Sequence, residues 1–250
     1  MLLLHGLGGN RDQAMDLLPA AWPGTRIAPD LPGHGSAALH SRQAVGFDAF
    51  AILIATFLDR LHTEALIPPG PVPVVGVSMG AGVAVRLAAD RRDLVSRLVL
   101  VRPTWLDTGS PAHLAPFQAV ADLLRRHGSA QGARLFQAGG LYRCLAETAP
   151  ATAESLLKQF TRPAAERHVR VLEELPADCP LPSRAHYAAL DTDIFVIVSD
   201  DPLHPAAVGL TLQKWIPASR IIEIVNKNMD PHAHQRALHD AVIGELDHLN

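Results

Sequence analysis

The chain has little cysteine, little lysine and no long apolar run. Its 250 residues include two cysteines, Cys144 and Cys179, which are too few for a disulfide framework and are typical of a reducing compartment. The longest apolar stretch, Phe47 to Leu58, is interrupted by Asp48 and falls short of the ~18 residues that cross a bilayer. The first residues include no charged leader and no small-residue cleavage site. We therefore expect a cytoplasmic protein without a signal peptide or membrane contact.

Charge and metal-binding patterns are equally sparse. The formal net charge is −3 and 48% of the residues are hydrophobic, which excludes a disordered chain and leaves no basic surplus for nucleic acid. Only three of the 22 basic residues are lysines, a bias typical of a GC-rich bacterial genome. The nearest histidine pair, His232 and His234, does not share a helix face, and no glycine-rich dinucleotide motif or Walker lysine is present. We expect no metal and no cofactor, and a small molecule as the substrate.

Short β-type runs alternate with helical patterns along most of the chain. This alternation is typical of βαβ units around a parallel sheet. The predicted strands are Leu2–Leu4, Thr25–Ala28, Pro71–Val77, Leu98–Val101, Ile194–Val198 and Ile221–Val225. The clearest predicted helices span residues 47–61, 79–89 and 231–249. The pattern predicts an α/β domain with a mainly parallel sheet.

The alternation stops between Pro103 and about Ala189. No strand-like run occurs there, and helical segments such as Phe117–Arg126 and Glu166–Leu175 follow one another between glycine and proline breaks. We interpret residues 104–189 as a helical cap inserted into a core formed by residues 1–103 and 190–250.

The strongest local signal is Gly76-Val77-Ser78-Met79-Gly80, a G-x-S-x-G sequence between a strand and a helix. A serine in such a strand-to-helix turn is strained and exposed. Side chains two positions before and after it would collide, so both positions need glycine. The pattern predicts a nucleophilic serine at residue 78.

Three further motifs stand in order around this one: His5-Gly6-Leu7-Gly8-Gly9, the segment from Asp30 to Ser36, and Asp200-Asp201-Pro202-Leu203-His204-Pro205. Together the four motifs resemble the α/β-hydrolase superfamily, specifically its capped serine hydrolases of the lactonase, esterase and carbon–carbon hydrolase type. The resemblance covers the chain outside the cap. It implies an α/β-hydrolase fold and a Ser-His-Asp triad.

The resemblance assigns the oxyanion hole to the backbone N–H groups of Leu7 and Met79. It makes His5 an organiser of the first loop and not the catalytic base. The Asp30–Ser36 segment is a structural turn by the same comparison.

The catalytic acid should follow the next-to-last strand. The family commonly places it four residues before a proline, which favours Asp201 through Pro205. Asp200 is an alternative, and so is Asp107, at the other acid position that some members use.

The base should follow the last strand. The usual Gly-His pair is absent, and the segment from Lys227 to His234 resembles a variant with a short loop. In that variant an Asp-Pro pair precedes the histidine by several residues, which favours His234 over His232. We expect His204 to be a loop or pocket-rim residue.

The cap offers apolar side chains for a substrate pocket, namely Trp105, Phe117, Phe136, Leu141 and Tyr142. Such residues at helical spacing also serve as ordinary core. The reaction we expect is cleavage of a small or medium apolar ester, lactone or thioester through an acyl-enzyme. The alternatives are a carbon–carbon bond hydrolase, a metal-free perhydrolase using the same triad, and a ligand-binding receptor with little turnover.

Members of this superfamily normally have two strands before the His-Gly loop, and this sequence begins inside the strand that leads into that loop. We therefore expect a six-stranded sheet with Thr25–Ala28 at its edge. An open edge is a template for association. It would be covered by a second copy in a homo-oligomer, unless the reading frame is annotated too short.

Overall fold

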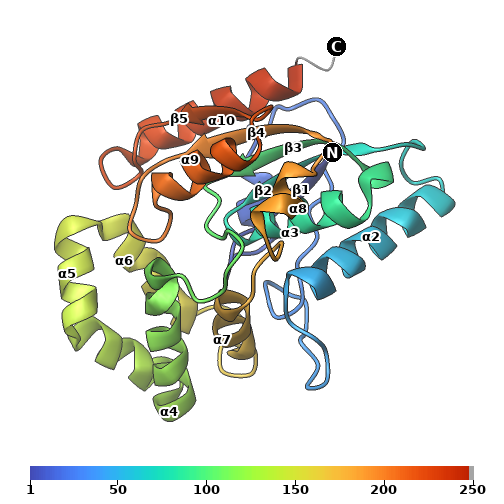
Figure 1. Cartoon of the computed structure of the whole chain (residues 1–250). Helices are drawn as coiled ribbons and strands as arrows, with labels where there is room; N and C mark the ends of the chain where they lie inside the picture. The colour runs from blue at the N-terminus through green and yellow to red at the C-terminus, as the bar shows by residue number, and fades with distance from the viewer. Residues whose placement is uncertain (248–250) are drawn as a thin grey trace.

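The computed structural model describes residues 1–247 (Figure 1). Five parallel strands form one sheet in the order β1-β2-β3-β4-β5. The strands are β1 (Leu2–Leu4), β2 (Val72–Val77), β3 (Val95–Val101), β4 (Asp193–Val198) and β5 (Arg220–Glu223). The helices are α1 (Arg11–Met15), α2 (Phe47–Thr63), α3 (Met79–Asp90), α4 (Ala115–Ala138), α5 (Gly140–Thr148), α6 (Pro150–Leu157), α7 (Arg170–Ala177), α8 (Arg184–Ala188), α9 (Ala206–Trp215) and α10 (Pro231–Asp247). Within these residues, no helix combines the length and apolarity that a membrane span requires.

The sheet is buried on both faces, which is why its strands are apolar runs and do not alternate with polar residues. Leu3, Val75 and Val99 belong to a core cluster that includes residues of α1 and α10. Their neighbours Leu2 and Val74 belong to a larger cluster that includes α2 and α3. Successive side chains of a strand point to opposite faces, so the two clusters lie on the two sides of the sheet.

Helix α2 shows how the pattern becomes packing. Four apolar residues recur at helical spacing and form the buried side of this helix: Phe47, Phe50, Ile54 and Leu58. Asp48 in the first turn complements the positive end of the helix dipole. The predicted helices over 47–61 and 79–89 are confirmed to within two residues, and the predicted end of the final helix, Leu249, lies outside the described residues.

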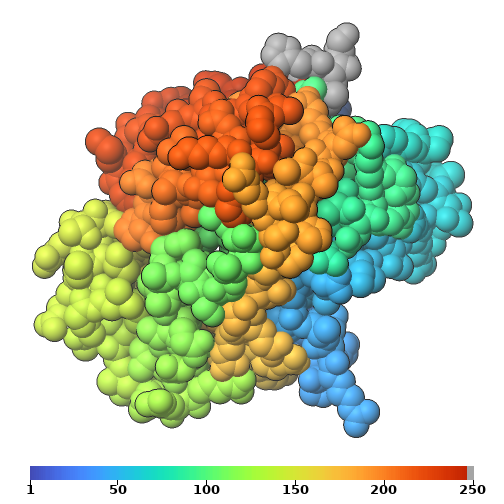
Figure 2. Space-filling view, in the orientation of Figure 1, coloured from blue at the N-terminus to red at the C-terminus, as the bar shows by residue number. Residues whose placement is uncertain are grey.

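Helices α4 to α8 occupy the interval between β3 and β4, where the sequence predicts a cap. Helices α4, α5 and α6, drawn from green to yellow, form a lobe below the sheet (Figures 1 and 2). Helix α4 is interrupted at Gly128, whose φ of +68° is left-handed. The carboxylate of Glu166 then accepts the N–H of Ser129 at 2.6 Å and caps the second half of the helix.

The predicted strand Thr25–Ala28 is not formed, and the expectation of six strands is wrong by one. Only Ile27 bridges to β1, donating its N–H to Met1 O at 3.0 Å and accepting from the N–H of Leu3 at 2.8 Å. Prolines at 23 and 29 bracket the segment and offer no N–H for a ladder. The segment lies beside the edge strand as predicted but contributes one bridge and no strand.

Candidate active site

Ser78 lies in the turn between β2 and α3 and has a strained backbone, with φ 54° and ψ −110°. The glycines on either side are required by close backbone contacts. A Cβ on Gly76 would stand 2.3 Å from the carbonyl oxygen of Gly80, and a Cβ on Gly80 would stand 2.3 Å from that of Leu4. The local sequence therefore forces Ser78 out of the turn at the carboxyl end of the sheet, where this fold class collects its ligand-binding groups.

Two backbone N–H groups beside Ser78 are unused. Among residues 1–247, neither the N–H of Leu7 nor that of Met79 donates to a protein acceptor. Met79 opens α3, so its N–H also lies at the positive end of the helix dipole. An unpaired pair of donors at this position can stabilise negative charge on a carbonyl oxygen.

The loop that carries Leu7 is fixed by His5. The buried imidazole accepts the N–H of Leu31 on Nε2 at 3.0 Å, so Nδ1 carries the proton and donates to Gly6 O at 2.9 Å. Burial lowers the pKa of His5, which keeps it neutral. Gln13 Oε1 accepts the N–H of Gly6 at 2.8 Å and adds a second restraint.

The Ser78 hydroxyl is hydrogen-bonded to a neighbour that sequence reasoning did not single out. Its Oγ lies 3.2 Å from Thr104 Oγ1, and Thr104 donates to Arg102 O at 3.2 Å. A hydroxyl has one proton, so Ser78 is the donor to Thr104. In this arrangement the hydroxyl of Ser78 donates to another hydroxyl and not to an imidazole.

Asp201 follows β4 and its side chain is fully buried. Its Oδ1 accepts the N–H groups of Leu203 and His204, at 2.9 and 3.1 Å, and the Nδ1–H of His204 at 3.0 Å. Its Oδ2 accepts Arg102 Nη1 at 3.0 Å. Burial alone would raise the pKa of Asp201, but His204 and Arg102 outweigh it and hold the pKa well below its usual range.

The two histidines near Asp201 differ in environment. Burial, together with the positive charge of Arg102, lowers the pKa of His204 to about 4. His234, in the first turn of α10, donates Nδ1–H to Val225 O at 2.7 Å and makes no hydrogen bond to Asp201 or Ser78 in the described part of the chain. Burial also lowers the pKa of His234. Both rings have their proton on Nδ1, because a carboxylate and a carbonyl only accept.

The alternative candidates for the base and the acid have other environments. His232 is exposed on α10. Asp200 is exposed and accepts the N–H of Ala206 at 2.8 Å, which caps α9. Asp107 is half-buried in the loop after β3.

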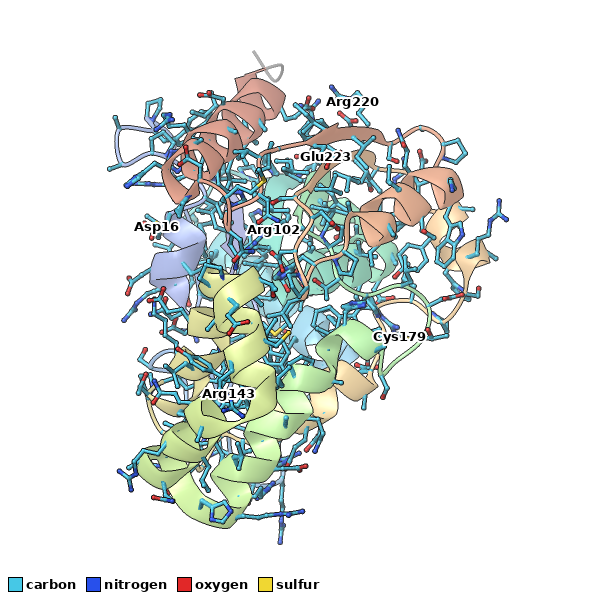
Figure 3. The ribbon with its side chains drawn as sticks, turned by 90° about the vertical axis from the view of Figure 1, so that its left-hand side faces the viewer. Asp16, Arg102, Arg143, Cys179, Arg220 and Glu223 are labelled. Carbon is cyan, nitrogen blue, oxygen red and sulfur yellow. The ribbon has the colours of Figure 1, made fainter. Side chains whose placement is uncertain are left out.

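The structure adds Arg102 and Lys227, which sequence reasoning missed. Each directly follows or closely follows a strand, β3 and β5 respectively. Figure 3 shows Arg102 between α10 above and the helices of the lobe below. A charged residue at the end of an apolar strand run, and one of only three lysines just past the last strand, were the available signals.

The predicted pocket residues pack mainly with one another and with the core. Trp105 meets the ring of Phe47 edge-on at 5.2 Å between centroids, and Phe136 meets Tyr142 at 5.6 Å. Trp105, Phe117 and Phe136 are buried, Tyr142 is partly buried and Leu141 is exposed.

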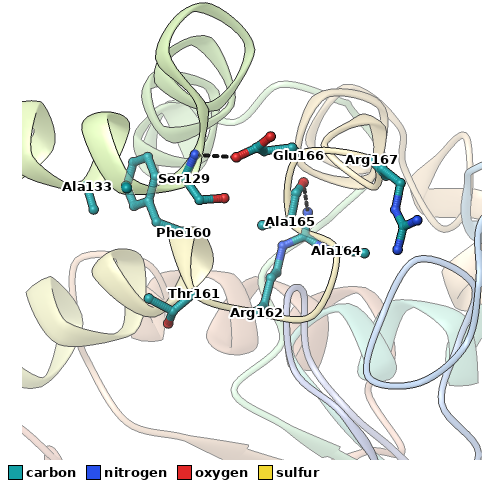
Figure 4. A pocket seen from close by; sticks show the side chains of 10 residues that line it. Ser129, Ala133, Phe160, Thr161, Arg162, Ala164, Ala165, Glu166 and Arg167 are labelled. Atoms are coloured by element: carbon teal, nitrogen blue, oxygen red, sulfur yellow. Dashed lines mark hydrogen bonds between the residues drawn. The ribbon is translucent and has the colours of Figure 1, made fainter.

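A cavity of about 530 Å³ opens in the lobe between α4 and the segment 160–167 (Figure 4). It is lined by Phe160, Arg162 and Glu166 among others, and by none of the five predicted pocket residues. Arg162 donates to the backbone oxygens of Gly33 and His168, each at 2.9 Å, so it ties the lobe to the core.

Within residues 1–247, no group of three or more His, Cys, Asp or Glu side chains is placed to hold a metal ion. The groups at the carboxyl end of the sheet are a strained serine, two free N–H donors, a buried carboxylate and two imidazoles. These are the groups that acyl transfer requires.

Parts of the chain are similar to curated proteins. The chain is 38% identical over 101 residues to a pimeloyl-[acyl-carrier protein] methyl ester esterase of Neisseria meningitidis, covering 39% of this chain and 34% of that protein. It is 38% identical over 109 residues to the dihydrolipoyllysine-residue acetyltransferase component of the acetoin cleaving system of Cupriavidus necator, covering 41% and 26%. The chain thus matches about a quarter to a third of the length of these curated relatives.

Solved structures share the whole fold. The enol-lactonase of Burkholderia xenovorans superposes with a TM-score of 0.74 at 21% identity, covering 98% of this chain and 90% of that one. An esterase of Thermogutta terrifontis superposes with a TM-score of 0.68 at 22% identity, covering 97% and 89%. The sequence profile of the alpha/beta hydrolase fold matches residues 1–228, so this chain belongs to the alpha/beta hydrolase family.

Proposed function

We propose that this protein is a serine hydrolase that cleaves a small or medium ester, lactone or thioester with an apolar acyl group. The observation that carries the proposal is the strained Ser78 beside two unused N–H donors, Leu7 and Met79. Backbone donors held in place before the reaction stabilise the oxyanion that forms when a serine attacks a carbonyl. Removing one such donor in a comparable enzyme costs about 2.7–4 kcal/mol.

We assign the base to His234 and not to His204. A general base works best when its pKa lies near the operating pH, and the pKa of His204, lowered to about 4, makes it a weak base. His234 borders an open cavity of about 300 Å³ that also reaches Val77, the residue before Ser78. The hydrogen bond to Val225 O fixes its proton on Nδ1 and leaves Nε2 free to accept.

We assign Asp201 the role of the acid. Its carboxylate is buried and ionised, and its charge raises the pKa of His234 against the effects of burial and Arg102. A buried carboxylate stabilises the imidazolium that forms when the base takes the serine proton. For direct contact, His234 would exchange its bond to Val225 O for one to Asp201, a tightening that is common when substrate binds to an apo site.

The reaction would then run in two halves. Ser78 Oγ leaves Thr104 and attacks the carbonyl carbon while its proton passes to His234 Nε2. The leaving alcohol or thiol takes that proton and departs. Water then attacks the acyl carbon and gives a proton to the same nitrogen, which passes that proton to Ser78 Oγ as the ester bond breaks and the carboxylic acid leaves.

The relatives favour ester chemistry over the other uses of this fold. The Neisseria protein is a methyl ester esterase by name, and its similarity to this chain reaches 38% over the matched residues. A carbon–carbon hydrolase, a perhydrolase and a receptor are the alternatives. Hydrolysis of a panel of p-nitrophenyl esters separates the receptor, and a peroxide-dependent halogenation assay separates the perhydrolase.

Labelling with a fluorophosphonate tests the nucleophile without knowledge of the substrate. We expect one label per chain, located on Ser78 by peptide mapping, and loss of both labelling and esterase turnover in Ser78→Ala. Ser96→Ala is the matched control, because Ser96 is exposed on β3 and should leave both unchanged. Labelling at another serine, or full activity in Ser78→Ala, would contradict the proposal.

A further inference from the structure

Two cationic side chains, each from the loop after a strand, line the same cavity. Arg102 follows β3, and Lys227 lies in the loop after β5. Both line the cavity of about 300 Å³ that is also bordered by His234, and by Ala151 of α6. The cavity therefore lies next to the proposed base, among residues of α1, α10 and the carboxyl ends of β2 and β3.

The positive charge in this cavity is incompletely matched. Arg102 donates a hydrogen bond from Nη1 to Asp201 Oδ2, but its Nε is buried and has no hydrogen-bond partner. The Lys227 ammonium makes no side-chain hydrogen bond or ion pair with any residue from 1 to 247. Burial and the nearby charge of Arg102 lower the pKa of Lys227 to about 8.

The neighbouring carboxylates do not supply the missing charge. Both oxygens of Asp201 already accept hydrogen bonds, from His204 and from Arg102. Glu154 is paired with Lys158 at 2.8 Å. Asp16 borders the cavity but is exposed, where solvent screens its charge (Figure 3).

We propose that Arg102 and Lys227 form a binding site for a carboxylate group of the substrate, beside His234. The inference rests on the proposed function and narrows it to acyl compounds with a free carboxylate, such as half-esters of dicarboxylic acids. A carboxylate would pair with the Lys227 ammonium and with the Arg102 guanidinium where that side chain lines the cavity. This contact would also orient the substrate, and so help to position its acyl carbon for attack by Ser78.

Two esters that differ only in the terminal group provide the test. Mono-p-nitrophenyl succinate and p-nitrophenyl butyrate have the same leaving group and the same acyl length. We expect kcat/KM for the succinate ester to exceed that for the butyrate ester by tenfold or more. Lys227→Met should lower kcat/KM for the succinate ester at least tenfold more than it changes kcat/KM for the butyrate ester, and so remove most of this preference.

Matched variants separate charge from structure. Lys227→Arg keeps the positive charge and should retain most of the preference. Lys214→Met removes an exposed lysine on α9 and should change neither ester. Loss of the butyrate reaction in Lys227→Met together with a lower melting temperature would indicate misfolding. In that case Lys227→Gln and Lys227→Arg, compared on the same two esters, decide the question.

Isothermal titration calorimetry of succinate binding to the Ser78→Ala variant distinguishes this inference from the proposed function. Succinate should bind to Ser78→Ala. It should bind at least tenfold more weakly to the double variant that also contains Lys227→Met. If butyrate ester is cleaved but succinate neither binds nor is preferred as an ester, the anion site is refuted and the hydrolase assignment stands. If neither ester is cleaved but succinate binding depends on Lys227, the site is supported and the reaction assignment fails. Equal binding of sulfate would overturn the assignment to a carboxylate.

Discussion

Replacing Arg102 with methionine should lower the stability of the fold markedly. The Arg102 side chain is 11% exposed and its partner Asp201 is fully buried, so the pair at 3.0 Å is shielded from water. Removing one member of a buried ion pair leaves an uncompensated charge, whereas removing both members is often nearly neutral. Methionine matches the length of the arginine stem, which keeps the loss of packing small.

The size of the effect follows from the donors that Asp201 retains. Breaking a buried pair costs about 3–5 kcal/mol. Asp201 keeps the N–H of Leu203 and both the N–H and the ring of His204, so we expect a cost near the lower end, about 3 kcal/mol. For a chain of this length each kcal/mol corresponds to roughly 2–4 °C, which gives a fall in melting temperature of roughly 6–12 °C.

Urea denaturation at pH 7 measures the difference. Arg60→Met is the control, because Arg60 is 76% exposed and pairs with Glu64 on the same helix, a contact worth about 0.3–0.5 kcal/mol. The double variant Arg102→Met with Asp201→Asn should recover most of the loss, since no bare charge remains. If Arg102→Met costs no more than Arg60→Met, the pair is not shielded and the reasoning about the buried charge is wrong.

Two further predictions concern histidines. His234→Ala should lower kcat by ~10³-fold or more in an ester assay, as the loss of a triad member does, while the exposed His232→Ala should lower it less than twofold. The opposite ranking would move the base to His232. Burial lowers the pKa of His5 and His34 in the folded state, so both take up protons on unfolding below pH ~6.5. The free energy of unfolding should therefore be unaffected by these two rings above that pH. Below it, this free energy should fall by up to about 1.4 kcal/mol per pH unit for each ring. His34→Phe should reduce this slope between pH 6.5 and 5 in urea titrations, and an unchanged slope would count against a neutral buried His34.

Much of the fold could be predicted because its signals are local. The strand-to-helix turn around Ser78 needs only the spacing of two glycines, and the structure places the serine where that spacing predicts. The alternation of apolar runs with amphipathic helices predicted the remaining strands along the chain and the strand-free interval after β3. Thr25–Ala28 failed this test because its pairing depends on the partner strand and on flanking prolines and not on its own pattern.

The surroundings of the serine could be predicted only in part. Sequence motifs located Asp201 and the two N–H donors, because strand ends and tight turns fix their places. The proton partner of Ser78 is Thr104, a residue without any motif, and the aromatic residues expected in a pocket are mostly core. Periodicity does not separate an apolar side chain that faces a ligand from one that faces another helix.

The amino-acid sequence by itself determined the family, the strained turn at Ser78 and the strand ends at which the candidate site lies. Only the tertiary structure decided which charges face one another there. Arg102 and Asp201 are 99 positions apart and become partners because β3 and β4 are neighbours in a parallel sheet. Lys227 joins them because β5 is the next strand of the same sheet. Coulombic energy depends on distance and burial, which the chain acquires only when it folds, so no spacing in the sequence encodes this group.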